Sequence, residues 1–235
     1  MIPFSLDHHL RKRSLGPACA LNASVVIKRQ PTQVSVSSLS PEHAERAAAV
    51  FHQPWFRCYT NDDPIGVELC GAGKNVYAIA AGVAAGLGYE NNARAGNLAE
   101  LTRVGVAYGA SPITFLSLAG IGDLFLTCSS EKSRNFTVGY RLGQGESLDD
   151  ILTTLGSVAE GVESSMGYKM IIDRVGVEAP IANAVYRVLY EGAVLKGVVE
   201  DVLNLPRMVE HDLPPLGTSP VDDLLSRLKL TPIRR

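Results

Sequence analysis

The stretch IGVELCGAGKNVYAIAAGVAAGL, residues 65–87, decides which fold we expect for this chain. Its small and apolar side chains predict one long helix that packs closely against its neighbours. Lys74 lies in the middle of this helix, where a buried ammonium group must find partners or lower its pKa. A lysine placed in this way can hold and donate a proton. The alternative is that the aliphatic stem of Lys74 carries the charge to the surface.

Helical periodicity with many small residues continues from this stretch to about Leu205. The frequent alanine and glycine residues indicate helices that pack closely through small side chains. The pattern predicts further helices at 92–109, 111–117, 134–142, 147–154, 161–175, 180–191 and 195–203. We therefore expect an all-α region over residues 65–205.

Before residue 65 the sequence predicts strands alternating with a helix. The β-branched residues between Ala23 and Ser38 favour two short strands on either side of residues 28–31. Ser40-Pro41-Glu42 is typical of a helix start, and this helix should reach about His52. A strand follows at 55–59 and a turn at 61–64. Residues 14–64 thus predict a partial βαβ unit, and the expected fold class is mainly α with a partial α/β unit in front.

The two ends of the chain carry little pattern. We expect a flexible start over residues 1–13 and a mostly disordered tail over residues 206–235. Within this tail, one short stretch from Val221 to Leu230 is amphipathic.

Charge and composition exclude several classes of function. A formal net charge of −2 gives no electrostatic case for binding nucleic acid. The 4 cysteines have no C-x-x-C spacing, which argues against a zinc or redox site, and we expect no metal. The start lacks the apolar segment of a secretory signal, and the longest apolar run, Val76–Gly88, is too short to span a bilayer. We therefore expect a cytoplasmic protein without a membrane span.

Three G-x-G sequences, at 71–73, 120–122 and 143–145, are candidates for nucleotide binding. None continues to the third glycine of G-x-G-x-x-G, and none joins a predicted strand to a helix. Gly73-Lys74 is not a phosphate-binding P-loop, because Asn75 stands where a magnesium-binding serine or threonine is needed. These residues therefore contain no pyrophosphate fingerprint.

Polar clusters that can carry chemistry follow Lys74. Asp123 and Thr127 put a carboxylate and a hydroxyl in an apolar segment, where Asp123 can steer a lysine or cap a helix. Ser133-Arg134-Asn135 begins a predicted helix, which suits either a bound phosphate or a capped surface helix. Glu160 can accept a sugar hydroxyl or favour the start of the next helix.

Taken together, these clusters resemble the NAD(P)-dependent glycerol-3-phosphate dehydrogenases in order and spacing. Residues 67–76 and 80–82 are similar to the lysine-bearing helix of that family. Further motifs match at 118–124, 127–128, 133–135, 142–145, 158–162 and 180–181. Upstream, residues 16–21 resemble the family's Gly-Pro-Ser-Phe-Ala segment, and residues 59–63 its domain junction. The resemblance covers roughly residues 14–205 and implies the end of a Rossmann domain followed by the helical catalytic domain.

The resemblance implies reduction of dihydroxyacetone phosphate to sn-glycerol 3-phosphate, a glycerolipid precursor, with hydride from NADH or NADPH. It implies Lys74 as the proton donor, oriented by Asn75 and Asp123, with Thr127 close by. The residues that it implies for binding the substrate are Gly16, Lys74, Asp123, Ser133, Arg134 and Asn135. Those that it implies for binding the cofactor are Ala20, Arg134, Val158 and Glu160.

The chain departs from the family pattern in three places. The glycine fingerprint and the first Rossmann strands are missing, so we expect an N-terminally truncated chain with compromised cofactor binding. Ala18 replaces a serine of the family, and residues 92–98 are about four residues short, roughly one helical turn. The alternative functions are a non-catalytic fragment or partner-binding pseudoenzyme and, ranked last, another member of the wider hydroxyacid dehydrogenase group. A homodimer is the possible assembly.

Overall fold

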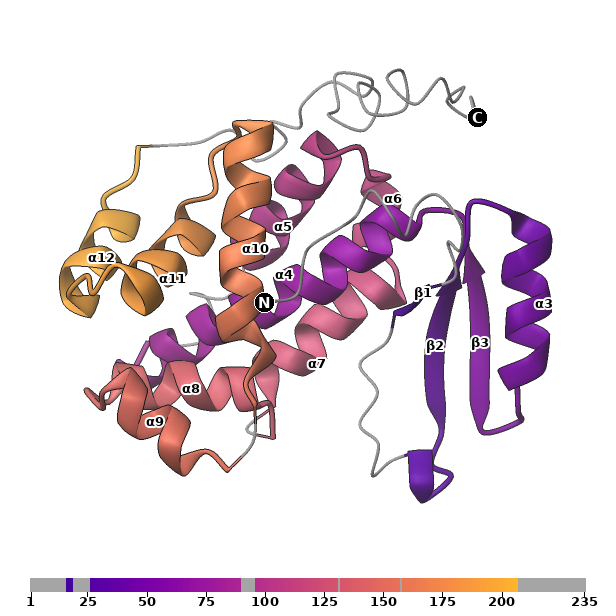
Figure 1. Ribbon diagram of the computed structural model, residues 1–235, viewed down its shortest axis with the longest axis horizontal. Coiled ribbons are helices and arrows are strands. Elements are labelled where there is room, and N and C mark those ends of the chain that lie inside the picture. Colours follow the sequence, from indigo (N-terminus) through magenta and orange to yellow (C-terminus); the bar gives the residue numbers. More distant parts are fainter. Residues whose placement is uncertain (1–15, 19–25, 90–95, 131, 157, 207–235) are drawn as a thin grey trace.

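The computed structural model describes residues 16–18, 26–89, 96–130, 132–156 and 158–206, the first of these ranges as backbone only. A small sheet lies at one end of the molecule, and a body of helices makes up the rest (Figure 1). The long helix α4, Pro64–Gly86, leads from the sheet into the middle of the helical body. The fold is mainly α, as the sequence predicts.

The sheet contains strands β1 (Gly16–Ala18), β2 (Thr32–Ser37) and β3 (Phe56–Asn61) in that order. β1 runs antiparallel to β2, whereas β2 and β3 are parallel. A parallel pair needs a crossover connection, which helix α3, Pro41–Phe51, provides. The Ser40 side chain caps α3 by accepting a hydrogen bond from the His43 amide. The predicted βαβ unit is therefore confirmed.

The first of the two strands predicted between Ala23 and Ser38 is wrong for the residues that the structure describes. Val26 and Ile27 form a helical turn, closed by a 3.0 Å hydrogen bond from the Arg29 amide to the Val26 carbonyl. The Ile27 side chain is 81% exposed. β-branched residues favour strands when neighbouring side chains cover them, and here none does.

Asp63 fixes where α4 begins and ties that end to the helical body. Its carboxylate accepts hydrogen bonds from the Gly66 amide at 3.0 Å, the Ser111 amide at 2.8 Å and the Thr114 hydroxyl at 2.7 Å. Thr114 belongs to the short helix α6, Pro112–Phe115. Because Asp63 is buried, these three bonds replace the hydrogen bonds that water would give it.

The middle of the helical body is a close crossing of α4 with α8, Arg134–Gly143. Gly82 and Gly86 of α4 meet Gly139 and Gly143 of α8 at this crossing. A Cβ atom on Gly139 would lie 1.9 Å from the carbonyl oxygen of Ile79. The two helix backbones can approach this closely only because glycine has no side chain.

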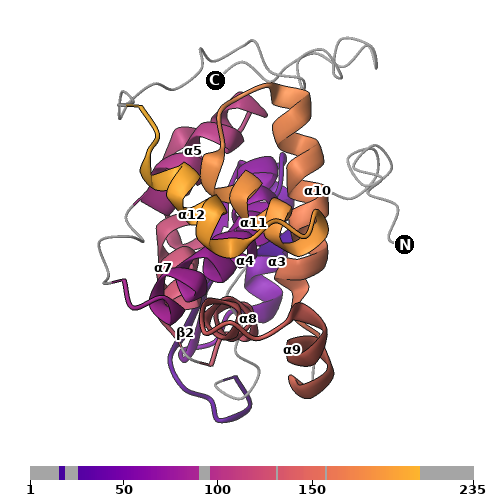
Figure 2. The ribbon, with the colours of Figure 1, turned by 90° about the vertical axis from the view of Figure 1, so that its left-hand side faces the viewer.

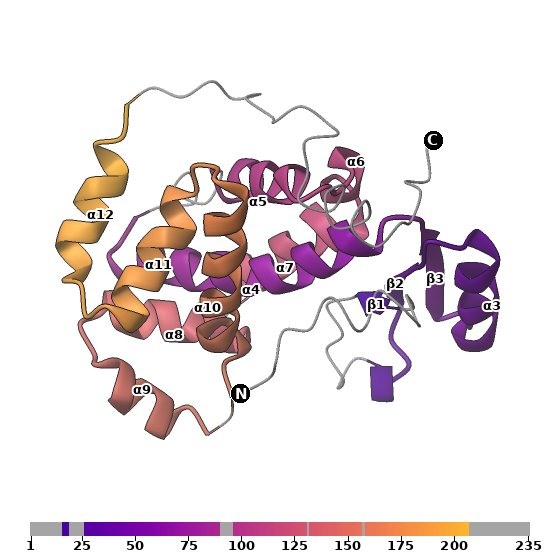
Figure 3. The ribbon, with the colours of Figure 1, turned by 45° about the horizontal axis from the view of Figure 1, so that its top comes forward.

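The remaining helices surround α4 (Figures 2 and 3). They are α5 (Gly96–Ala107), the π-helical turn η2 (Leu118–Gly122), α7 (Asp123–Ser129), α9 (Leu148–Thr154), α10 (Glu160–Val175), α11 (Pro180–Tyr190) and α12 (Leu195–Leu203). The helices predicted between residues 134 and 203 are confirmed to within about a residue at most ends. The sequence pattern does not predict η2 or α7.

Glu100 of α5 joins three helices through one buried carboxylate. It accepts hydrogen bonds from the Ile181 and Ala182 amides at the start of α11, at 2.9 and 2.8 Å. The Tyr77 hydroxyl of α4 donates to the same group at 3.2 Å. Burial raises the pKa of Glu100, and the two amides and Tyr77 oppose that rise. This contact fixes the start of α11 relative to α4.

One stretch of the described residues, Pro112–Ser129, has the length and the mean hydropathy, 1.4, of a helix that could cross a membrane. The stretch is divided into α6, η2 and α7 in the fold, and 39% of it is buried. It is weak evidence for a membrane span. The expectations for residues 1–13, 92–95 and 207–235 fall outside the described part, and the domain limits at 64 and 205 stay predictions.

Candidate active site

Lys74 and Asp123 form an ion pair inside the helical body. Lys74 projects from the middle of α4, Asp123 is the first residue of α7, and the Lys74 Nζ atom lies 2.6 Å from Asp123 Oδ2. The exposed fractions of the two side chains are 14% and 4%. Lys74 therefore holds a carboxylate rather than extending along its stem into solvent. Because water is largely excluded, this pair is electrostatically stronger than a surface pair.

The turn that precedes α7 brings Asp123 to Lys74. In η2, Gly120 packs directly on the backbone of Phe115, and a Cβ at Gly120 would lie 2.2 Å from the Phe115 carbonyl oxygen. One turn later, the Thr127 hydroxyl donates to the Asp123 carbonyl at 2.7 Å and lies 3.3 Å from Asp123 Oδ1. The carboxylate is thus held between an ammonium and a hydroxyl group.

The surroundings decide which group in this site has a proton to give. Burial raises the pKa of the Asp123 carboxyl, while the Lys74 charge and the hydrogen bonds from Lys74 and Thr127 oppose that rise. Burial also raises the pKa of the Cys70 thiol, one turn before Lys74, to about 12. Cys70 is therefore a neutral thiol at physiological pH. The pair of Lys74 and Asp123 can hold a proton at the Lys74 Nζ atom and transfer it to a neighbouring oxygen.

A chain of amide groups links Asn75 to the start of α10. The Asn75 Nδ2 group donates to the Gly71 carbonyl at 3.3 Å, and Asn75 Oδ1 accepts from Asn135 Nδ2 at 2.9 Å. Asn135 Oδ1 in turn accepts from the Gly161 amide at 2.8 Å. Asn75 and Asn135 are buried, so both side chains are fixed in orientation. This chain connects α4, α8 and α10.

Arg134 lies at the first turn of α8, close to the buried chain of amides. It is exposed, and its guanidinium group has no hydrogen-bond partner among the described residues. The Ser133 hydroxyl caps α8 by accepting from the Phe136 amide at 3.3 Å. The capped helix weighed as the alternative to a phosphate site is therefore real. It leaves the Arg134 guanidinium available to a ligand.

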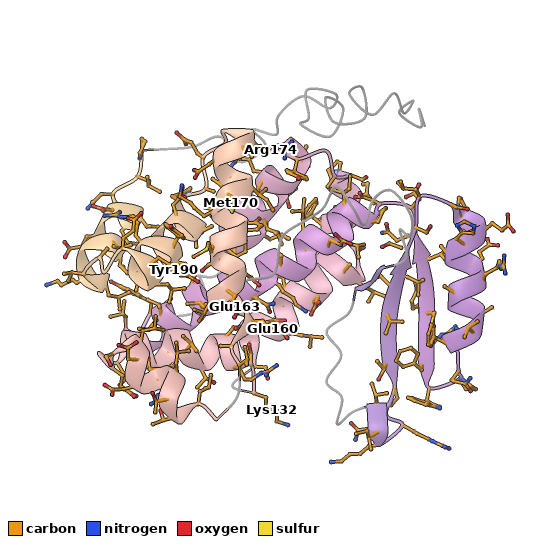
Figure 4. The ribbon with its side chains drawn as sticks, viewed as in Figure 1. Lys132, Glu160, Glu163, Met170, Arg174 and Tyr190 are labelled. Atoms are coloured by element: carbon orange, nitrogen blue, oxygen red, sulfur yellow. The ribbon has the colours of Figure 1, made fainter. Side chains whose placement is uncertain are left out.

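The residues expected near a cofactor are only partly described. Glu160 is the first residue of α10, and Figure 4 shows it with Glu163 at the end of α10 that lies toward Lys132 in that view. Val158 is 65% exposed. Gly16 belongs to β1, which lies beside α4, and its backbone pairs with Ser37. Ala20 lies outside the described residues.

The structure forms two hydrogen-bonded groups, Lys74–Asp123–Thr127 and Asn75–Asn135, which adjoin because Lys74 and Asn75 are consecutive residues of α4. Ser133, Arg134, Val158 and Glu160 are neighbours in sequence of these groups or of Gly161, and Gly16 belongs to a strand that contacts α4. Their roles stay predictions. Within the described ranges, no group of three His, Cys, Asp or Glu side chains could hold a metal ion.

Sequence reasoning missed Gly161. A Cβ atom there would lie 2.7 Å from the Asn75 carbonyl oxygen and 2.9 Å from Asn135 Oδ1. Its lack of a side chain therefore lets α10 begin against the amide chain. Two signals in the sequence pointed to it: Gly161 lies within the family motif at 158–162, and it is a glycine in the first turn of a predicted helix, where glycine is otherwise unfavourable.

Comparison with a model of known families matches residues 63–200 to "NAD-dependent glycerol-3-phosphate dehydrogenase C-terminus". Curated glycerol-3-phosphate dehydrogenases [NAD(P)+] of Staphylococcus aureus strains USA300 and COL are 45% identical to the chain over 199 residues. The match covers 83% of this chain and 59% of each relative. The chain therefore spans about three fifths of the length of these relatives.

Solved structures give the same picture. Glycerol-3-phosphate dehydrogenase from Coxiella burnetii superposes with a TM-score of 0.75 and 34% identity, covering 80% of this chain and 59% of that one. The enzyme from Plasmodium falciparum has a TM-score of 0.73 at 16% identity, covering 83% of this chain and 58% of that one. At this low identity the second likeness shows the fold alone.

Proposed function

This chain belongs to the NAD(P)-dependent glycerol-3-phosphate dehydrogenase family, and from that premise we propose that the whole protein reduces dihydroxyacetone phosphate to sn-glycerol 3-phosphate. The observation that carries the proposal is the enclosed pair of Lys74 and Asp123, at 2.6 Å, beside the amide chain of Asn75 and Asn135. A ketone is reduced by adding a hydride to carbon and a proton to oxygen. The cofactor supplies the hydride, and this chain supplies the proton.

Lys74 is the proton donor in this proposal. Its ammonium group attracts the ketone oxygen and polarises the carbonyl bond before the proton moves from Nζ to that oxygen. Asp123 keeps the ammonium in place, and Thr127 steadies Asp123 through its hydroxyl. After the transfer, the neutral amine remains beside Asp123 until it takes up a proton from solvent.

Arg134 is the residue that binds the substrate phosphate. Its planar guanidinium can donate two parallel hydrogen bonds to phosphate oxygens. It starts α8, whose positive end also favours an anion, and Ser133 and Gly16 are proposed to lie nearby. Asn135 Oδ1 accepts a hydrogen bond from the Gly161 amide, and Asn135 Nδ2 donates one hydrogen to Asn75. The second hydrogen of Nδ2 can be donated to the substrate.

The residues present fit the nicotinamide end of a cofactor better than its other end. Val158 offers an exposed apolar surface, and Glu160, two residues later at the start of α10, offers an exposed carboxylate. We assign these two and Arg134 to the cofactor, with Ala20 as a further expected contact. None of the three G-x-G sequences is a pyrophosphate fingerprint, so we propose that these 235 residues alone bind NADH or NADPH weakly. We also propose that the whole protein is a cytoplasmic homodimer. Its product, sn-glycerol 3-phosphate, supplies glycerolipid synthesis.

The missing fingerprint motivates a second function, that of a non-catalytic, partner-binding relative. Oxidation of NADH and NADPH with dihydroxyacetone phosphate, followed by absorbance, separates the two functions. For an active enzyme, Lys74→Met should lower kcat/KM by at least about 100-fold, the usual contribution of a general acid. Lys169→Met, which removes a half-buried lysine that pairs with Asp173 on α10 and lies over the Tyr186 ring of α11, should leave it unchanged.

Turnover that Lys74→Met leaves intact would refute the proposed proton donor. No turnover with either cofactor, when the Staphylococcus aureus relative is active under the same conditions, would favour the second function. Titration calorimetry with glycerol 3-phosphate measures binding at the substrate site, and this measurement does not require hydride transfer. Binding that is lost in Arg134→Met, and kept in Lys169→Met, supports the phosphate site in either case.

A further inference from the structure

An apolar groove of about 200 Å³ lies between α4, α11 and α12, away from Lys74. Its floor is the C-terminal half of α4, and one wall is α11. The other wall is formed by every apolar side chain of α12: Leu195, Val198, Val199, Val202 and Leu203. The lining is aliphatic apart from Tyr89 and Asn97. Figure 2 shows α11 and α12 on the same side of α4.

Several side chains of this groove remain exposed in the described part of the chain. The exposed fractions of Leu87, Tyr89 and Leu203 are 39%, 46% and 65%. Removing such a surface from water is favourable by about 25 cal/mol per Å² of apolar area. α12 packs on α11, and its remaining apolar surface faces the groove. The groove thus has the character of a binding surface for a helix with one apolar face.

A segment with the complementary character follows α12 in the same chain. Residues 221–230, VDDLLSRLKL, lie outside the described residues, and their sequence places Val221, Leu224, Leu225 and Leu228 at helical spacing. Ser219-Pro220 is a favourable N-cap and first turn, followed by Asp222 and Asp223. Arg227 and Lys229 come near the end, where positive charge favours a helix.

The chain between the groove and the segment is long enough for the segment to reach the groove. α12 ends at Leu203, which itself lines the groove, and the described chain continues to Pro206. The linker of residues 207–220 can extend about 46 Å, at roughly 3.3 Å per residue. α12 is only about 14 Å long at 1.5 Å per residue. The segment can therefore fold back over the groove without strain.

We propose that residues 221–230 form an amphipathic helix that docks in the groove of their own chain, with Leu224, Leu225 and Leu228 covering the side chains of α12 and α4. Because the segment is tethered through only residues 207–220, its effective concentration at the groove is in the millimolar range. A second copy of the chain, or a free apolar ligand, must compete with that concentration. This inference concerns a face of α4 beyond the active site and does not rest on the proposed function.

Amide hydrogen exchange on the full chain tests the docking. The amides of residues 222–230 should exchange at least tenfold more slowly than those of a free peptide of the same sequence. The variant Leu224→Asp/Leu228→Asp should abolish this protection and also speed exchange in α12. The matched control Ser226→Asp changes the opposite face of the helix, about 140° from Val221, and should leave both unchanged. Full-rate exchange at 222–230 in the native chain overturns the proposal.

Two further measurements identify any other occupant of the groove. Protection that falls on dilution, together with a change in sedimentation, would assign the groove to a second copy and overturn docking in cis. An apolar fluorescent dye should bind the Leu224→Asp/Leu228→Asp variant several-fold better than the native chain or Ser226→Asp. Equal dye binding by all three would mean that the groove is open to external ligands, and would also overturn the proposal. No readout depends on turnover.

Discussion

Replacing Gly139 with alanine should force α4 and α8 apart. The new Cβ atom would lie 1.9 Å from the Ile79 carbonyl oxygen and 2.9 Å from the Val83 amide nitrogen. An ordinary contact begins at 3.4 Å, so the backbones must separate by about 1.5 Å. Both neighbours are main-chain atoms of a helix, which cannot turn aside as a flexible side chain can.

The expected cost follows from two opposing effects. Overpacking a well-packed core costs about 1–3 kcal/mol, and a clash with backbone belongs at the upper end of that range. Alanine in place of a helical glycine contributes about 0.5–1 kcal/mol in the opposite direction. We expect Gly139→Ala to lower the free energy of unfolding by about 2 kcal/mol, or Tm by roughly 4–8 °C for a chain of this size.

Gly71→Ala is the matched control on α4. A Cβ atom at Gly71 would meet nothing within 4 Å, so only the gain in helix propensity remains. This variant should be more stable by about 0.5–1 kcal/mol. Urea denaturation of both variants and the native chain, followed by circular dichroism, gives the comparison. If Gly139→Ala loses no stability relative to Gly71→Ala, the backbone crossing does not hold the two helices as argued.

Three other predictions concern buried ionisable groups. Asp63→Ala should cost about 2–3 kcal/mol in urea denaturation, because three hydrogen bonds end on that carboxylate. A loss of less than about 0.5 kcal/mol, the size expected for an ordinary surface substitution, would contradict this. Burial raises the pKa of Glu100 above its ordinary value of 4.5, so the stabilising contribution of this carboxyl group is present below that pH and is lost as pH rises through the folded-state pKa. The stability difference between the native chain and Glu100→Gln should therefore shrink from pH 4.5 toward neutrality, and a constant difference would count against it. The buried Cys70 thiol, with a pKa of about 12, should react with iodoacetamide far more slowly than Cys58 in the folded protein, as peptide mass spectrometry can measure.

Much of the helical body could be predicted because local signals agree with the fold. The helix predicted at 65–87 is α4, Pro64–Gly86, and its start follows from Asp63 and Pro64, a good N-cap and first residue. Ser40 and Pro41 mark the start of α3 in the same way. At these positions the residue that begins the helix and the apolar pattern that buries it predict the same structure.

The segment from Leu118 to Ser129 could not be predicted for the opposite reason. Gly120 and Gly122 indicate a turn, and the apolar residues around them follow no helical period. The π-helical turn forms because Gly120 packs on the backbone of Phe115, a tertiary contact that local propensity does not record. A strand at Val26 and Ile27 fails similarly, because no neighbouring element covers Ile27.

Within the site, the sequence suggested partners but not geometry. It indicated that Asp123 can steer Lys74, and the 2.6 Å contact agrees with that pairing, although the catalytic roles of both residues stay predictions. Asn135 was interpreted as a phosphate ligand. Its amide is largely committed to Asn75 and Gly161, which are 60 and 26 residues away in sequence. Contacts of this kind depend on how α4, α8 and α10 cross.

The crossing of α4 and α8 also explains how the site is kept in register. Lys74 lies eight residues before Gly82 on α4, about 12 Å along the axis, and Arg134 lies about 7.5 Å from Gly139 on α8. The proposed proton donor and phosphate ligand therefore lie on two helices, α4 and α8, that contact each other backbone to backbone. Repacking of side chains changes a contact between backbones little, whereas one methyl group added at Gly139 displaces the helices that carry Lys74 and Arg134. A displacement of about 1 Å at a reacting centre can cost a hundredfold in rate. The glycines at the crossing are thus as necessary to the proposed chemistry as the residues that would perform it.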